Sequence, residues 1–136
     1  NLNVLTNGLY TALELMKIDS VNVHLLGGNL NKILLDTKGT DTMSQIGMHH
    51  SDIAFISCRG ITARGSFDPN DDETAVKRAF AENSTKVVLF ADSSKFNKTF
   101  LNVSLGYDVI DAIISDAPFP EDIQEVCRNK NVEMLW

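Results

Sequence analysis

The sequence has few cysteines and no excess of positive charge, and each of these absences excludes a class of protein. Its two cysteines, Cys58 and Cys127, form no CxxC pair and have no histidine at ligand spacing. We therefore expect reduced, buried thiols and neither a disulfide framework nor a zinc site. Acidic residues outnumber basic ones by 18 to 12, for a net charge of −6. Phosphate contacts dominate binding to nucleic acids, so we do not expect this segment to bind DNA by itself.

Long apolar runs and the common cofactor motifs are also missing. No run approaches the ~20 apolar residues of a membrane span, and no signal peptide is visible, so we expect a cytoplasmic protein without a membrane partner. The sequence contains no GxGxxG, Walker, GxSxG or HExxH motif. We therefore predict no dinucleotide, no metal and no other cofactor, and no nucleophile with an adjacent base can be identified.

The pattern that remains is an alternation of strands and helices. Apolar runs predict strands at 2–6, 21–26, 52–57, 86–91, 109–115 and 132–135. Helical patterns lie at 8–18, capped by Asn7, and at 40–48, 70–83 and 119–129. Because the best strands are continuous apolar runs, we expect them to be covered on both faces. The prediction is a single α/β domain over 1–136, with a mainly parallel sheet flanked by helices.

Polar residues gather where the predicted strands end. In an open α/β sheet the ligand crevice lies beyond these carboxyl ends. Lys95 and Arg59 could neutralise a phosphate or carboxylate there, and glycine would let a ligand approach the backbone. Glu73 and Lys77, one helical turn apart, could face the same edge. The candidate binding residues are Thr6, Asn7, Gly27, Gly28, Arg59, Gly60, Glu73, Lys77, Asp92 and Lys95.

Each candidate also has a purely structural interpretation. The Gly27–Gly28 pair is more often a turn than a ligand cradle. Lys95 could be a solvated loop lysine, and Asp92 could cap the turn that follows its strand. Glu73 and Lys77 could form an ion pair on the helix surface. Residues and spacing alone therefore reach a small α/β domain with a possible anion site.

Six segments, in order, resemble the effector-sensing domain of the DeoR family of bacterial transcriptional repressors. They are VLTNGL, VHLLGG, SDIAFISCRGIT, ETAVKRAF, VVLFADSSKF and IISD. The third segment matches the family form D-x-x-F-x-x-x-x-G-I through Asp52, Phe55, Gly60 and Ile61. The match covers most of the chain. The resemblance implies a fold like that of ribose-5-phosphate isomerase and glucosamine-6-phosphate deaminase.

The resemblance also implies a function. A DeoR-type sensor binds a phosphorylated sugar without turning it over, and binding controls DNA binding through the oligomer. Lys95 would contact the anion or a hydroxyl, with Asp92 orienting it. Thr6 and Asn7 would line the crevice, beside glycines 27, 28 and 60. Site roles for Glu73 and Lys77 are a weaker implication, and Arg59 is a candidate from its chemistry alone.

Two family features are not found in this sequence. One is the winged helix-turn-helix that contacts DNA, and the other is the D-x-G-T-T segment that cradles the phosphate. We therefore expect a sensing domain truncated at its N-terminus, which meets DNA only through the absent domain. Two alternatives stay open: a sugar-phosphate isomerase or deaminase, or a ligand-free oligomerisation module. Phe100, Leu101 and Trp136 could serve subunit contacts or complete the core.

Overall fold

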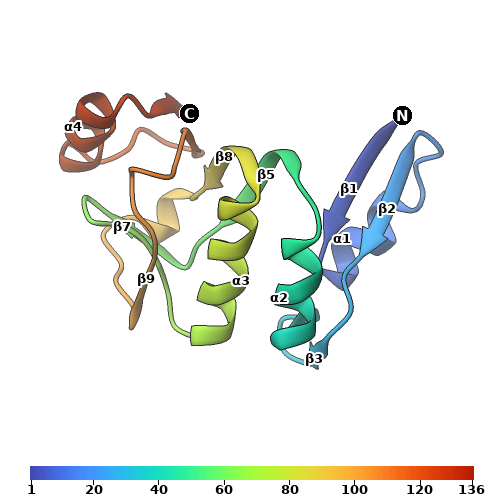
Figure 1. Cartoon of the computed structure of the whole chain (residues 1–136). Coiled ribbons are helices and arrows are strands. Elements are labelled where there is room, and N and C mark those ends of the chain that lie inside the picture. The colour runs from blue at the N-terminus through green and yellow to red at the C-terminus, as the bar shows by residue number, and fades with distance from the viewer. The chain divides into compact units, whose positions relative to one another are not determined.

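The computed structural model describes residues 1–136, which fall into two compact units, 1–49 and 50–136 (Figure 1). In the first unit, β1 (Leu2–Thr6) pairs in parallel with β2 (Val21–Leu25), and the connection between them contains helix α1 (Leu9–Leu15). A short antiparallel hairpin of β3 (Asn29–Asn31) and β4 (Asp36–Lys38) follows, and α2 (Thr40–Gly47) ends the unit. The predicted helix at 40–48 is confirmed.

Helix α1 differs from its prediction in its cap, and its apolar side chains are mostly exposed. Its cap is Gly8, because the Asn7 side chain instead donates from Nδ2 to the carbonyl of Thr37, 2.8 Å away. Of its side chains only Ala12 is buried, while Leu13 and Met16 are 56% and 69% exposed. The apolar spacing of this helix therefore does not mark a face buried within the described structure.

The second unit carries a four-stranded parallel sheet in the order β11-β10-β8-β5. Its strands are β5 (Ser51–Ser57), β8 (Ser84–Phe90), β10 (Ala112–Ile114) and β11 (Glu133–Leu135). Helix α3 (Asp71–Glu82) leads into β8, and α4 (Glu121–Lys130) connects β10 to β11. Leu89, Ile113, Ile123 and Cys127 are fully buried in the core. The α/β fold class with a parallel sheet and flanking helices is confirmed.

The expectation that the most continuous apolar strands are covered on both faces is wrong for β5. Burial alternates along this strand, with Ala54 and Ile56 in the core and Ile53 and Phe55 exposed. The Phe55 ring stacks on Phe90 of the neighbouring β8, with 5.6 Å between the ring centroids. An apolar run therefore does not by itself establish a second covering layer.

A second sheet in this unit was not predicted from the sequence. It is antiparallel, in the order β6-β7-β9, and consists of β6 (Gly60–Thr62), β7 (Gly65–Asp68) and β9 (Asn102–Leu105). After β8 the chain forms the single 3-10 turn η1 (Ser93–Lys95). None of the four α-helices has the length and apolar character needed to cross a bilayer.

Candidate functional site

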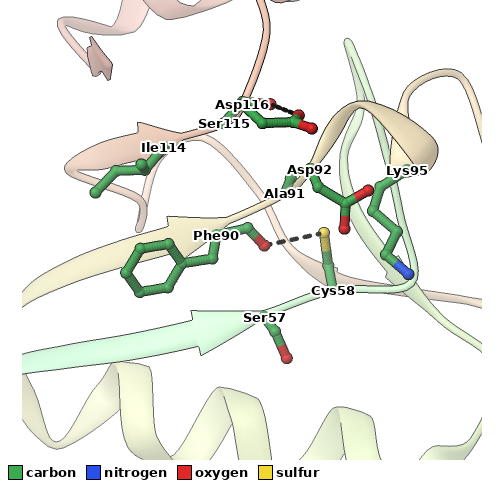
Figure 2. Close-up of a pocket in the computed structure, with 9 residues that line it drawn as sticks. All are labelled: Ser57, Cys58, Phe90, Ala91, Asp92, Lys95, Ile114, Ser115 and Asp116. Carbon is green, nitrogen blue, oxygen red and sulfur yellow. Dashed lines mark hydrogen bonds between the residues drawn. The ribbon is translucent and has the colours of Figure 1, made fainter. Parts of the chain in front are cut away.

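A pocket of about 260 Å³ lies where β5, β8 and β10 end (Figure 2). This edge is where ligands bind in open α/β sheets. Each of the three strands contributes its last residue or the residues that follow it. The lining residues are Ser57, Cys58, Phe90, Ala91, Asp92, Lys95, Ile114, Ser115 and Asp116.

Asp92 begins the η1 turn at the rim of this pocket. Its Oδ1 accepts a hydrogen bond from the amide of Ser94 at 2.9 Å, and its carbonyl accepts one from the amide of Lys95 at 2.9 Å. The bonds from Ser94, helped by the nearby Lys95 cation, hold the pKa of Asp92 below its usual range. The capping interpretation of Asp92 is confirmed, and the carboxylate stays ionised beside the pocket.

Lys95 is the only cationic residue among the nine that line the pocket. Its side chain is half-buried, and the structure gives its ammonium group no hydrogen bond or ion pair. Figure 2 shows the side chain extending from the turn beside Asp92 and Cys58. The ammonium group is therefore available to bind a phosphate or carboxylate of a ligand.

Cys58 lines the pocket, and its buried thiol is poorly suited to act as a nucleophile. Its thiol points at the carbonyl of Phe90, with 3.9 Å between Sγ and O. Burial, reinforced by the negative charge of Asp68, raises the pKa of Cys58 to about 12. Because the thiolate is the reactive species, this cysteine is inert at neutral pH.

Asp116 was not selected as a site residue from the sequence, although it closes the IISD segment. Its Oδ1 accepts a hydrogen bond from the amide of Ser93 at 2.7 Å, and Oδ2 lies 3.4 Å from the Ser93 hydroxyl. The bond from the Ser93 amide holds the pKa of Asp116 below its usual range. The signal that could have identified it is its place directly after a predicted strand, which is also where Asp92 lies.

The predicted glycines pack tightly against their own chain. A Cβ on Gly60 would lie 2.2 Å from the carbonyl oxygen of Lys98, so this backbone approach is internal. Gly28 has a φ of +142°, and a Cβ there would lie 2.0 Å from Oγ1 of Thr42. Gly27 is bonded through its amide to Oε1 of Gln45 at 3.0 Å. These contacts give each glycine a structural reason to be present.

Glu73 and Lys77 do not pair with each other. Lys77 on α3 donates to the buried Asp68 of β7 at 2.5 Å, and Glu73 accepts from the side chain of Asn70 at 3.0 Å. The adjacent Arg78 donates to the carbonyls of Ser104 and Val103 in β9, at 3.0 and 2.5 Å. The lysine and arginine of this motif thus fasten α3 to the antiparallel sheet.

The pocket therefore brings together two of the predicted residues, Asp92 and Lys95. Arg59 follows β5 with an exposed side chain, and its amide donates to the carbonyl of Phe67 at 3.0 Å. In the first unit, Thr6 accepts a hydrogen bond at Oγ1 from the amide of Gly8 at 3.1 Å. Ligand contacts by any of the ten residues stay predictions. No three His, Cys, Asp or Glu residues lie close enough together to hold a metal ion.

Comparison with known families decides the relationship. The chain matches the model of the DeoR C-terminal sensor domain over residues 1–117. It belongs to the DeoR family. The resemblance inferred from the six segments is thereby confirmed.

Similar proteins of this sensor-domain family are transcriptional regulators. The chain is 32% identical over 136 residues to the glycerol-3-phosphate regulon repressor of Escherichia coli, covering 98% of this chain and 54% of that protein. It is 30% identical to a putative aga operon transcriptional repressor of Escherichia coli, over 96% of this chain and 49% of the relative. A regulator of Bacillus subtilis, IolR, is 24% identical over 97% of this chain and 53% of its own length. The chain spans about half the length of these curated relatives.

Proposed function

We propose that this DeoR-family sensor domain binds a phosphorylated sugar at the pocket formed by β5, β8 and β10. Binding there controls the DNA affinity of a helix-turn-helix domain in the full-length repressor, and the sugar is released unchanged. The repressor acts in the cytoplasm. DNA is a partner of the whole protein and not of this acidic chain.

The observation that carries the proposal is the unpaired, half-buried Lys95 at the pocket. Its ammonium group supplies the positive charge that a phosphate needs. Asp92 and Asp116 supply carboxylate oxygens, the acceptors suited to sugar hydroxyls. One of the similar proteins is named as a repressor of the glycerol-3-phosphate regulon, which supports a phosphorylated effector here.

The same residues favour sensing over isomerase chemistry. An isomerase needs a general base whose pKa lies near the working pH. Here the pKa values of Asp92 and Asp116 are both lowered by hydrogen bonds from the turn, which makes these carboxylates weak bases. Cys58 remains protonated because burial raises its pKa. The two carboxylates are thus suited to accept hydrogen bonds from sugar hydroxyls but poorly suited to act as a general base, which supports sensing over isomerase chemistry.

The test is a thermal-shift panel of phosphorylated sugars on this chain. A ligand at 100 times its dissociation constant stabilises a folded protein by ~2.7 kcal/mol, which is readily detected. We expect at least one sugar phosphate to raise the melting temperature, Lys95→Ala to abolish the rise, and Lys98→Ala to retain it. Lys98 is the matched control because it is an exposed lysine outside the pocket lining.

Two results would contradict the proposal. A full-length protein that also ignores every phosphorylated sugar does not sense this class of effector. Consumption of the active sugar phosphate, followed by chromatography of the incubated mixture, would identify an enzyme instead.

We propose further that the protein works as a homo-oligomer. Phe100, Leu101 and Trp136 are 40%, 82% and 57% exposed, so these residues do not complete the core of the described chain. Their exposure leaves them free to contribute to subunit contacts. Light scattering during size-exclusion chromatography measures the mass in solution, and a monomeric mass at all concentrations would overturn this proposal.

A further inference from the structure

We propose that Asp116 is a positioning residue, which holds the η1 turn so that Lys95 faces the pocket. This inference rests on the proposed function, because it concerns how the same site presents its cation. Asp116 belongs to the segment after β10, whereas the turn follows β8. Figure 2 shows Asp116 and Asp92 near each other, after the two strands that pair in parallel. The Asp116 carboxylate bridges the segments that follow these strands.

The bridge acts on the first residue of the turn. Asp116 accepts the Ser93 amide at 2.7 Å, and Asp92 accepts the next amide, that of Ser94, at 2.9 Å. The amide of Lys95 donates to the carbonyl of Asp92. All three amides of the turn are consequently used within the protein.

This arrangement determines how an anion can be recognised at the pocket. Free backbone amides at the start of a helical turn are common anion donors. Here those three amides already donate to protein acceptors, so the cationic group left to meet an anion at the pocket is the side chain of Lys95. Asp116 contributes to anion recognition only by fixing the position of the Lys95 backbone, from which the side chain extends. A substitution of Asp116 therefore alters anion binding through the position of Lys95.

A second carboxylate, at the other end of β10, provides a matched control. Asp111 precedes β10 and accepts the amide of Val87 in β8 at 2.7 Å through Oδ2. It makes the same kind of bond between the same two strands, but it is not among the pocket-lining residues. Asp111→Ala thus removes an equivalent bond without touching the turn.

The experiment follows single amides of the 136-residue chain by ¹⁵N NMR. Hydrogen exchange at Ser93 measures the bridge, and titration with inorganic phosphate, read at the Lys95 resonances, measures its consequence. Loss of a hydrogen bond to a charged acceptor should speed exchange at Ser93 by about tenfold or more in Asp116→Ala. In that variant the apparent phosphate affinity should fall severalfold below that of Asp116→Asn.

The asparagine variant separates geometry from charge. Asp116→Asn and Asp116→Ala remove the same negative charge, but only asparagine keeps an oxygen that can accept the Ser93 amide. We expect Asn to preserve slow exchange and phosphate binding, and Asp111→Ala to leave both unchanged. The proposal is overturned if Asp116→Ala leaves Ser93 exchange unaltered, or if Asn and Ala weaken phosphate binding equally.

Failure of the proposed function gives a different result. If phosphate leaves the Lys95 resonances of the unmodified chain unmoved, the anion site itself is disproved, and with it the role of Asp116 in presenting that cation. Ser93 exchange in the three variants then reports on the bridge alone.

Discussion

Lys77 of α3 lies 2.5 Å from the carboxylate of Asp68 in β7, measured between Nζ and Oδ1, and the aspartate is completely buried. The hydroxyl of Ser104 in β9 donates to the other carboxylate oxygen. One buried charge thereby holds together a helix and two strands of the antiparallel sheet. Its partner lysine is 16% exposed, so the pair lies at the margin of the core.

Removal of the lysine should be strongly destabilising. Lys77→Met leaves Asp68 buried without its counter-charge, which typically costs about 3–5 kcal/mol. Urea denaturation of both proteins measures the difference in the free energy of unfolding. Lys17→Met is the control, since Lys17 pairs with Glu14 at 2.7 Å on the exposed surface, where such a pair contributes ~0–1 kcal/mol. Equal losses in the two variants would contradict a special role for Asp68.

Removal of the Lys95 side chain should have little effect on the stability of the fold. Because its ammonium group has no protein partner, Lys95→Ala is expected to change the free energy of unfolding by less than about 1 kcal/mol. The same urea titration tests this expectation in the absence of any ligand. A large loss of stability would indicate a structural role for Lys95 and would weaken the use of this variant as a binding probe.

Gly60 should not tolerate a side chain. The carbonyl oxygen of Lys98 would lie 2.2 Å from the new Cβ, and backbone cannot move aside as a flexible side chain can. Overpacking of this kind costs typically ~1–3 kcal/mol. We expect Gly60→Ala to lower the unfolding midpoint in urea.

Gly47 provides the comparison for Gly60. It is the last residue of α2, and a Cβ there meets no atom within 4 Å. Gly47→Ala is therefore expected to stabilise the chain by ~0.4–1 kcal/mol, because alanine restricts the unfolded chain. Destabilisation of similar size at both positions would show that steric contact is not the cause at Gly60.

Stability should fall in alkaline solution. Burial raises the pKa of Cys58 from 9.0 to about 12 and that of Cys127 to about 11, and it also raises the pKa of Tyr107. A raised pKa means that the folded state keeps a proton that the unfolded state releases. The associated stability is fully present below pH 9 and is lost as the pH rises from about 9 to 12.

Urea titrations between pH 7 and pH 11 measure this loss. Cys58→Ala should flatten the decline above pH 9, because it removes one of the groups that release a proton on unfolding. The comparison uses the slope of the free energy of unfolding against pH, because the cavity left by alanine lowers stability at every pH and does not change that slope. An unchanged slope would mean that Cys58 titrates normally in the folded chain.

Much of the fold could be predicted because its main elements carry strong local signals. The apolar run that ends in Ala91 predicted β8, and the acids from Asp71 to Glu73 predicted the start of α3. The polar segment after β8 pointed to Asp92 and Lys95, which do line a pocket. These predictions needed only neighbouring residues.

The antiparallel sheet and the ion pair could not be predicted in this way. All four residues of β7 are buried, but Ser66 and Asp68 interrupt the apolar pattern that signals a strand. The partner of Lys77 lies nine residues earlier on that strand, whereas Glu73 offered a plausible local partner. Asp116 likewise acquires its role only when β10 is placed beside β8, which is a tertiary relationship.

The two aspartates at the ends of β10 have a consequence for how this strand finds its place. Only three residues of β10 pair with β8, from Ala112 opposite Val88 to Ile114 opposite Phe90. Such a short strand could slide along its neighbour, and a slip of one residue would turn its side chains to the wrong face. In the observed alignment Asp111 accepts the amide of Val87 and Asp116 accepts the amide of Ser93, so a slip of one residue would move both carboxylates away from these amides. These two bonds thereby favour the alignment that places Ile114, Ser115 and Asp116 at the pocket.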